Sequence, residues 1–377
     1  MPHDPIELRG KARDSGRMIV LNRSTSNIEH AVFSSIADYF RPGDLLVLND
    51  SYMLSNTLWF QHGGESLQIT VYGHEPDGTT IVELKLSEDQ CEAGQVLTSL
   101  DDARITCTLL EHQPDKLWKA QFNPSELLLP TLDQYGARLD ETIHLNPVHW
   151  KSTPEAYRSL YAKKPGSLEI PSAGLHFSHE LLAQISAMGV EIAYITLHVG
   201  ATEIFAVRHI SEEEIEKHKV RSEYYEVSQR TAGQLNKARA EGRRVVAVGT
   251  TVMRTLETIT REMGRQTIIK PQYGWTDLYI YPGFKFNAVD VLLTNLHRPR
   301  SSHIVLTAAF AGTDFVMRSY DEISEKGGYE FDMFGDFSLL HIGNSSPLLP
   351  QGRFADPQRG QIEALRNFTI TSYNMRA

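Results

Sequence analysis

The stretch Arg244-Val245-Val246-Ala247-Val248-Gly249-Thr250-Thr251 joins an apolar run to a glycine and two threonines. The apolar run predicts a buried strand, and the threonines predict the start of a helix that continues to Arg261. Glycine lets a backbone approach a ligand closely, while hydroxyl groups and a helix N-terminus favour a polar or anionic group. The stretch lacks G-x-G-x-x-G and a Walker A lysine, so it is neither a dinucleotide fingerprint nor a P-loop. A simple tight turn is the alternative interpretation.

Helix and strand signals alternate around this unit through the second half of the chain, which predicts an α/β fold. An earlier apolar run, 45–48, follows a Pro-Gly-Asp turn and precedes Asn49-Asp50-Ser51, so a second buried strand should end in polar side chains. The other expected elements are a helix from the Ser178 cap to Ala187, a strand over 191–198, an acidic helix with a capping box at Ser211 and Glu214, a helix over 234–240, a strand over 277–281, and a helix from Ser301 or Ser302 to Phe310.

The segment from about 58 to 122 is different, because helix signals are almost absent from it. Short β-rich runs separated by turn residues predict a small antiparallel barrel or sandwich. These runs are 67–72, 80–86, 95–100, 104–110 and 117–122. We therefore expect a mixed α/β catalytic domain formed by residues 1–57 and 151–377, with an inserted small antiparallel β-barrel domain at 58–150.

Composition limits the class of protein. With 377 residues and 41% hydrophobic content, the chain is long enough for a large core and for two domains. A net charge of −10 argues against a general nucleic-acid coating protein, so only a local basic face would hold RNA. Two cysteines make neither a disulfide framework nor a cysteine-rich zinc site, and they favour a reducing compartment, the cytoplasm. No export signal or membrane span is expected.

Two histidines are candidates for proton transfer. His176 lies among small residues just before a helix N-terminus, where backbone N–H groups hold anions. His198 lies where a strand meets Val199-Gly200, at the kind of strand end where α/β folds assemble sites. A structural, hydrogen-bonded histidine is the alternative for each.

Four further residues offer polar groups near expected strand or helix ends. Arg254 lies in the helix after Gly249 and is either an anion clamp or a surface cation. Asp277 stands at an expected strand start, and Asn295 and His297 either contact a base or ribose or cap the next helix. No zinc-spaced cysteine and histidine pair, H-E-x-x-H or G-x-S-x-G occurs, so no metal site is expected and hydrolases are disfavoured.

Taken together, the chain resembles the S-adenosylmethionine:tRNA ribosyltransferase-isomerase family of the queuosine pathway. The resemblance covers most of the chain outside the β-rich insertion, and its motifs stand in family order. They are Arg13-Asp14-Ser15, Pro42-Gly43-Asp44 to Asn49-Asp50, Tyr161-Ala162-Lys163, Pro171-Ser172-Ala173-Gly174-Leu175-His176-Phe177, Thr196-Leu197-His198-Val199-Gly200, Ser222-Glu223-Tyr224-Tyr225, Ala247-Val248-Gly249-Thr250-Thr251 with Arg254-Thr255-Leu256-Glu257, Thr276-Asp277, Tyr281-Pro282-Gly283, Thr294-Asn295-Leu296-His297 and Phe334-Gly335-Asp336.

The resemblance implies a transferase and isomerase of queuosine biosynthesis, hence tRNA modification, in a monomer or weak dimer without a metal. S-adenosylmethionine would donate its ribosyl part to the 7-aminomethyl-7-deazaguanine of tRNA, giving epoxyqueuosine-tRNA, adenine and methionine. It also implies catalytic roles for His176, His198, Glu223 and Asp277, and we expect loss of His176 or Asp277 to lower turnover about a hundredfold. The implied residues for binding S-adenosylmethionine are Ala173, Gly174, Gly200, Gly249, Thr250, Thr251, Arg254, Asn295 and His297.

Several basic positions of the family pattern are different in this chain, which keeps a second hypothesis open. Segments 51–57, 63–65 and 329–331 lack expected cations, Val220-Arg221 replaces a Met-His pair, and Thr202-Glu203 replaces a Gly-Thr pair. Phosphate contacts need cations, so a paralogue that uses or cleaves S-adenosylmethionine with a small acceptor is the alternative, followed by a non-catalytic binding module. If tRNA is the acceptor, the remaining cations should form one face around the site. These are Lys163, Lys164, Arg221, Arg298 and Arg300.

Overall fold

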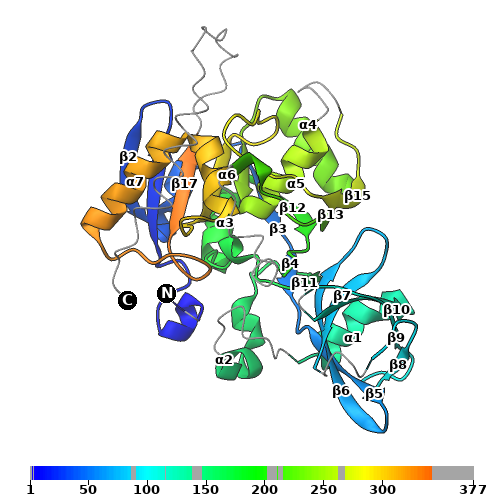
Figure 1. Ribbon diagram of the computed structural model, residues 1–377. Helices are drawn as coiled ribbons and strands as arrows, with labels where there is room; N and C mark the ends of the chain where they lie inside the picture. Colours follow the sequence, from blue (N-terminus) through cyan, green and yellow to red (C-terminus); the bar gives the residue numbers. More distant parts are fainter. Residues whose placement is uncertain are drawn as a thin grey trace.

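The computed structural model describes residues 2, 4–85, 91–114, 116–137, 147–201, 210, 215–261 and 268–341. Helices pack on a large mixed sheet, and a separate closed antiparallel barrel lies beside it (Figure 1). The predicted fold class, mixed α/β with a small antiparallel β-barrel, is confirmed.

The large sheet has a parallel centre, and the strands added on both sides of it pair mostly antiparallel. Its strands lie in the order β15 (Gln272–Thr276), β13 (Glu223–Val227), β12 (Glu191–Leu197), β3 (Leu45–Asn49), β14 (Val245–Val248), β16 (Val291–Asn295), β17 (Phe337–His341), β1 (Arg17–Asn22) and β2 (Asn27–Val32). Strand β3 pairs in parallel with β12 and β14, and β14 pairs in parallel with β16. The strand predicted from the apolar run at 45–48 is therefore central to the sheet.

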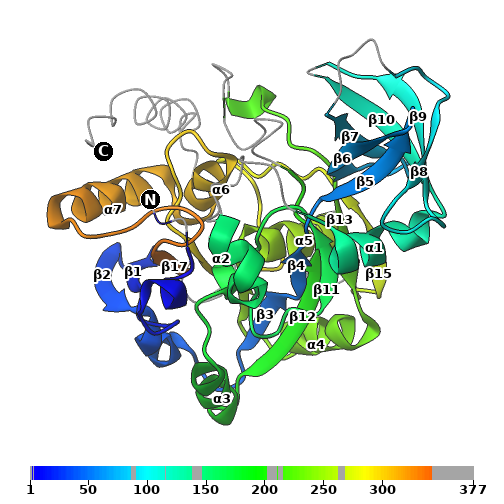
Figure 2. The same ribbon diagram turned by 90° about the horizontal axis from the view of Figure 1, so that it is seen from below.

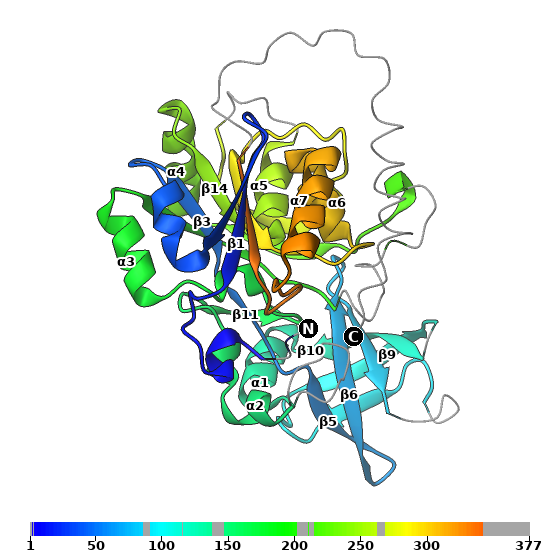
Figure 3. The ribbon, with the colours of Figure 1, turned by 90° about the vertical axis from the view of Figure 1, so that its left-hand side faces the viewer.

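Both faces of this sheet are buried, which explains why its central strands are continuously apolar. In β3, Leu45 and Val47 belong to one hydrophobic core, whereas Leu46 and Leu48 belong to another. The first core is covered by α4 (Gln229–Ala240), α5 (Thr250–Thr260), α6 (Ser302–Ala311) and α7 (Thr313–Lys326), and the second by η2 (Phe33–Tyr39) and α3 (His179–Ala187). Figure 3 shows α3 on one side of the sheet and α6 and α7 on the other.

The helix caps agree with the sequence signals. The hydroxyl groups of Ser178 and Ser301 accept hydrogen bonds from backbone N–H groups at the starts of α3 and α6. Helix α4 begins five residues before the predicted 234, because Ser228 caps it in the same way. Besides η2, the 3-10 helices of the described residues are η1 (Ile6–Arg9), η4 (Ser125–Leu127), η5 (Pro154–Tyr157), η6 (Ser172–Gly174) and η7 (Ile215–Lys217).

The barrel is formed by the β-rich runs predicted from the sequence. Its closed order is β10 (Leu117–Asn123), β7 (Thr80–Leu84), β6 (Glu65–His74), β5 (Thr57–His62), β8 (Val96–Ser99) and β9 (Thr106–His112). Two parallel strands, β4 (Ser51–Met53) and β11 (Lys164–Ser167), carry the chain into and out of this region, which also contains α1 (Leu128–Tyr135) and α2 (Pro147–Ser152). Figure 2 shows the barrel at one end of the molecule, next to β13 and β15.

The strand predicted at 277–281 is wrong, because β15 ends where that strand was expected to begin. The alternating pattern has another cause: Leu278 and Ile280 are buried in the first core without any strand pairing. The carbonyl oxygen of Leu278 accepts instead from Arg254 Nε at 3.0 Å. The capping box at Ser211 and Glu214 lies outside the described residues.

Within the described ranges, no helix is both long and apolar enough to cross a bilayer.

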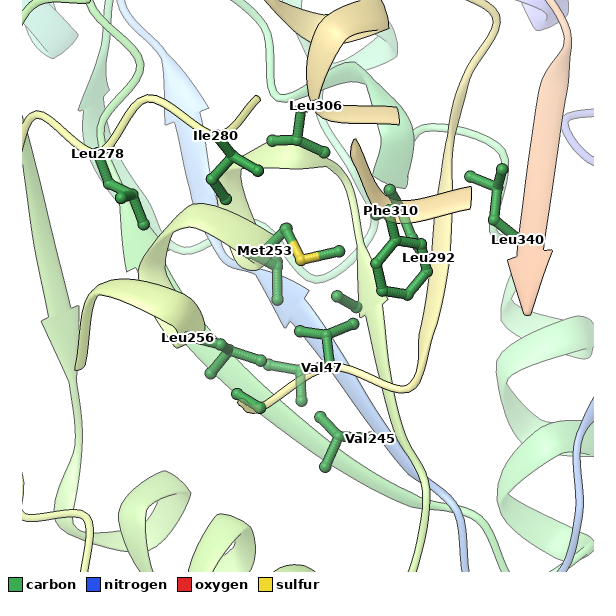
Figure 4. Packing of buried hydrophobic residues seen from close by; sticks show 14 of the residues in the cluster. Val47, Val245, Met253, Leu256, Leu278, Ile280, Leu292, Leu306, Phe310 and Leu340 are labelled. Atoms are coloured by element: carbon green, nitrogen blue, oxygen red, sulfur yellow. The ribbon is translucent and has the colours of Figure 1, made fainter. Parts of the chain in front are cut away.

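The first core should be sensitive to cavities, and α5 gives a direct test. Leu256 is fully buried there, close to Val47 and Val245 (Figure 4). Leu256→Ala should lower the free energy of unfolding by about 2–5 kcal/mol, because the removed methyl groups leave a cavity. Leu160→Ala is the control at a side chain that is 36% exposed. Urea unfolding followed by circular dichroism measures both, and equal losses would contradict this packing.

Candidate functional site

The predicted site residues gather where the parallel strands end. β12, β3, β14 and β16 are neighbours and run in the same direction, so their carboxyl ends share one edge of the sheet. Asn49 and Asn295 are the last residues of β3 and β16, while His198 and Gly249 directly follow β12 and β14. Ligands of open α/β sheets bind at this edge, so the arrangement itself marks a binding site.

Two adjoining cavities open at this edge. The larger cavity has a volume of about 450 Å³, within the range of small-molecule sites. It is lined by six of the predicted residues, which are His198, Gly200, Glu223, Thr250, Thr251 and Arg254. The barrel completes its wall with Tyr72, Gly73 and His74. The site is therefore built from both parts of the molecule.

The smaller cavity, of about 60 Å³, contains the other predicted binding residues. Ala173, Gly174, Gly249, Asn295 and His297 line it, and Thr250 and Thr251 line both cavities. The two threonines therefore mark the junction between the cavities. Eleven of the thirteen predicted site residues line one cavity or the other.

Hydrogen-bond donors converge on the smaller cavity. Gly249 has φ of 89°, a conformation that favours glycine, and α5 starts directly after it without a side-chain cap. The first N–H groups of α5 therefore have no partner within the helix. Asn295 is 4% exposed; its Oδ1 accepts from Ser172 Oγ at 3.1 Å, and its Nδ2 has no hydrogen-bond partner in the described part of the chain. These donors suit an anionic group such as a carboxylate.

The imidazole of His198 is held on the wall of the larger cavity. Its Nδ1 lies 2.8 Å from Ser51 Oγ, and its ring stacks on Tyr224 with centroids 5.6 Å apart. Gly166 makes room for it, because a Cβ there would lie 2.6 Å from ring atoms. Burial, followed by repulsion from His74 and Lys164, lowers the pKa of His198 to about 4. The imidazole is thus neutral at pH 7, and Nε2 remains for a ligand.

Glu223 and Arg254 form an ion pair inside the larger cavity. Arg254 Nη1 donates to Glu223 Oε2, while its Nε and Nη2 donate to the carbonyl oxygens of Leu278 and Thr276 at 3.0 and 3.2 Å. The other carboxylate oxygen of Glu223 accepts from Gly200 N–H at 2.9 Å. Every guanidinium nitrogen of Arg254 is thus engaged by the protein. The pair joins α5, β13 and the turn after β12, and so fixes the cavity wall.

His176 and Asp277 lie outside both cavity linings. His176 is 2% exposed, packs against the rings of Phe33 and Phe337, and has no hydrogen-bond partner for either nitrogen among the described residues. Burial, and then the charges of Arg13 and Arg9, lower its pKa to about 3. Asp277 is exposed, while its neighbours Thr276 and Leu278 are buried.

Three of the ring-bearing residues that line the larger cavity were not among the residues predicted from the sequence. His74 and Tyr72 come from the barrel, and Trp275 comes from β15. Trp275 packs edge to face on Tyr224, with centroids 5.8 Å apart. An isolated histidine or tyrosine at a barrel strand end carries no motif, so only the fold reveals these contacts.

Comparison with known proteins is consistent with this geometry. Residues 2–340 match the protein family described as queuosine biosynthesis protein. The chain belongs to this family. It is 37% identical over 344 residues to the S-adenosylmethionine:tRNA ribosyltransferase-isomerase of Desulfitobacterium hafniense, covering 90% of this chain and 97% of that protein. The protein of the same name from Thermotoga maritima is 38% identical over 339 residues, covering 89% and 95%.

A solved structure of a relative also matches this chain. The crystal structure of the S-adenosylmethionine tRNA ribosyltransferase from Thermotoga maritima matches with a TM-score of 0.50 and 32% identity, covering 90% of this chain and 96% of that one. S-adenosylmethionine is the co-substrate of the queuosine biosynthesis family. Within the described ranges, no three His, Cys, Asp or Glu side chains gather as a metal site.

Replacing His176 should separate a structural role from a catalytic one. In the unfolded chain its pKa is about 6.5, so acid favours unfolding as the pH falls from about 6.5 toward 3. His176→Leu removes this proton uptake and the two unpartnered nitrogens. We expect its acid-unfolding midpoint, measured by fluorescence, to move to lower pH, with turnover within about threefold of wild type because the residue lines neither cavity. A hundredfold loss of turnover would restore the catalytic role implied by the sequence.

Removing one charge of the buried pair should destabilise the fold. Glu223→Gln leaves Arg254 without its carboxylate and should lower the free energy of unfolding by about 3 kcal/mol. Glu226→Gln is the matched control, because its ion pair with Lys164 is more than one third exposed on both sides and contributes about 1 kcal/mol or less. Denaturant titration of both variants checks this, and an equal loss in the two would refute a stabilising role for the buried Glu223–Arg254 ion pair.

Proposed function

We propose that this protein is an S-adenosylmethionine-dependent ribosyltransferase-isomerase that acts on tRNA. It transfers the ribosyl part of S-adenosylmethionine to the aminomethyl group of a 7-deazaguanine in the anticodon, and it releases adenine and methionine. The observation that carries this proposal is the convergence of the family motifs on two joined cavities at the strand ends.

The methionine end of S-adenosylmethionine fits the smaller cavity. Its carboxylate would accept hydrogen bonds from Asn295 Nδ2 and from the first N–H groups of α5. Thr250 and Thr251 stand at the junction, so the sulfonium and the ribose extend from there into the larger cavity. Arg254 is held by Glu223 and two carbonyl oxygens, so its role is to position this wall of the cavity. The methionine carboxylate is then bound by the uncharged donors, Asn295 Nδ2 and the N–H groups of α5.

His198 is placed for proton transfer in the larger cavity. The sulfonium acidifies the neighbouring C5′–H bond; when this bond breaks, the electron pair stays on carbon and His198 Nε2 holds the proton. Adenine departs with one proton, the acceptor amine attacks the opened ribosyl group, and methionine leaves with the electrons of its carbon–sulfur bond. A neutral imidazole suits this role, since it does not repel the cationic sulfonium.

Aromatic side chains at the cavity support a nucleobase as acceptor. Tyr224 lies between His198 and Trp275, and Tyr273 extends this aromatic row on β15 with 76% of its surface exposed. RNA-binding proteins hold unstacked loop bases on such rings. We propose that the anticodon loop approaches along this row.

The relatives are named for tRNA and do not favour the second candidate, a small acceptor, but one observation bears on how tRNA would be held. Three of the five cations expected to hold phosphates are paired with carboxylates of the protein. Lys164 binds Glu226 at 2.6 Å, Arg298 binds Asp332 at 2.8 Å, and Arg221 binds Glu75. A cation that is already paired with a carboxylate contributes little to counterion release. The affinity for tRNA should therefore fall less steeply with salt than it would if all five cations contacted phosphates.

Release of adenine decides between the two candidates. The protein is incubated with S-adenosylmethionine, with and without tRNA carrying the aminomethyl base, and adenine is measured by chromatography. We expect adenine only when this tRNA is present, and gel-shift binding of the anticodon stem-loop that weakens between 50 and 200 mM salt, by about 10-fold to 100-fold for two or three phosphate contacts. Adenine release without RNA, together with no RNA binding at low salt, would establish the small-acceptor function.

We also propose that residues 58–150 form a domain inserted between 1–57 and 151–377, because the barrel has its own hydrophobic core. We further propose a cytoplasmic location, which suits a tRNA-modifying role, and a monomer or weak dimer, as the family resemblance implies.

A further inference from the structure

His74 is a second imidazole of the larger cavity, contributed by the barrel. It is the last residue of β6, where that strand reaches the sheet region. Its Nε2 is buried and has no hydrogen-bond partner among the described residues. Native proteins pair nearly all buried polar atoms, so an unpaired one on a residue that lines a cavity indicates a position completed by a ligand.

The two walls of the larger cavity are suited to different substrates. Thr250 and Thr251 connect one wall to the smaller cavity, where the carboxylate of S-adenosylmethionine is proposed to bind. Barrel residues line only the larger cavity, away from that anchor. His74 therefore stands on the side left for the acceptor.

An ion pair between the two parts of the molecule fixes this wall. Glu75 directly follows His74 in the barrel, and its carboxylate binds Arg221, which precedes β13 of the sheet. Arg221 also lines the larger cavity. The pair holds the end of β6 against the sheet and so positions the His74 ring over the cavity.

On the basis of the function proposed above, we propose that Nε2 of His74 accepts a hydrogen bond from the amino group of the acceptor base and orients it for attack. Burial lowers the pKa of His74 to about 4, so the ring keeps its lone pair at neutral pH. An aminomethyl group supplies the donor that this nitrogen lacks. Tyr72, beside it, adds an aromatic ring from the same strand.

Steady-state kinetics separate the two substrates. Adenine release is measured with tRNA carrying the aminomethyl base, varying tRNA at saturating S-adenosylmethionine and then the reverse. His74→Ala should lower kcat/KM for tRNA about 10-fold to 100-fold, with the KM for S-adenosylmethionine within about twofold of wild type. His74→Gln, which places an amide at a similar reach, should recover most of the loss. His112→Ala, an exposed barrel histidine, is the matched control and should behave as wild type.

A charge exchange tests the positioning pair independently. Glu75→Arg and Arg221→Glu should each lower kcat/KM for tRNA, and the double variant should restore it to within about fivefold of wild type, because the pair is re-formed in reverse. Wild-type kinetics for tRNA in His74→Ala, or equal losses for both substrates, would overturn the role of His74. No adenine from wild type with this tRNA would overturn the proposed function, and the role of His74 with it.

Discussion

The site depends on one constraint, the parallel pairing of β12, β3, β14 and β16. Parallel strands end at the same edge of the sheet, so the residues that follow them meet there although they are far apart in the sequence. Asn49 secures the register at this edge. Its side chain donates to the carbonyl oxygen of Leu197 and accepts from the N–H of the same residue, both at 3.0 Å. A shift of either strand would break both bonds and displace His198.

Two ion pairs then determine the shape of the cavity above this edge. Glu223 and Arg254 tie α5 to β13, and Glu75 and Arg221 tie the barrel to the sheet region. The first pair is largely buried and the second is partly exposed, so the second is more easily screened or opened. The wall proposed to bind S-adenosylmethionine is thus the more firmly held one, and the proposed acceptor wall is joined to it by the weaker contact.

The sequence predicted most of this arrangement for identifiable reasons. Continuous apolar runs such as 45–48 predicted strands buried on both faces, and serine caps predicted where α3 and α6 begin. The strand at 277–281 was wrong because Leu278 and Ile280 alternate for packing alone. Periodicity reports which side chains are buried, and it does not report which backbone groups are paired.

The candidate site shows the same contrast between features that local sequence predicts and features that depend on packing. Gly249, Thr250 and Thr251 were chosen from a glycine and threonine motif after a strand, and all three line a cavity, because local sequence determines both the turn and the helix start. His176 stands in a matched motif but packs between Phe33 and Phe337, away from the cavities, and a motif does not show which way a side chain points. His74 was missed because its place in the site depends on how the barrel meets the sheet.

The most direct test of the site at the strand ends is the recognition of the methionine carboxylate. Isothermal titration calorimetry compares S-adenosylmethionine with its decarboxylated form, on wild type and on Asn295→Asp. The variant replaces the unpaired Nδ2 donor with a negative charge beside the N-terminus of α5. We predict that wild type binds S-adenosylmethionine at least about tenfold more tightly than the decarboxylated form, and that the variant loses this preference. An unchanged preference in Asn295→Asp would contradict the placement of S-adenosylmethionine at this edge.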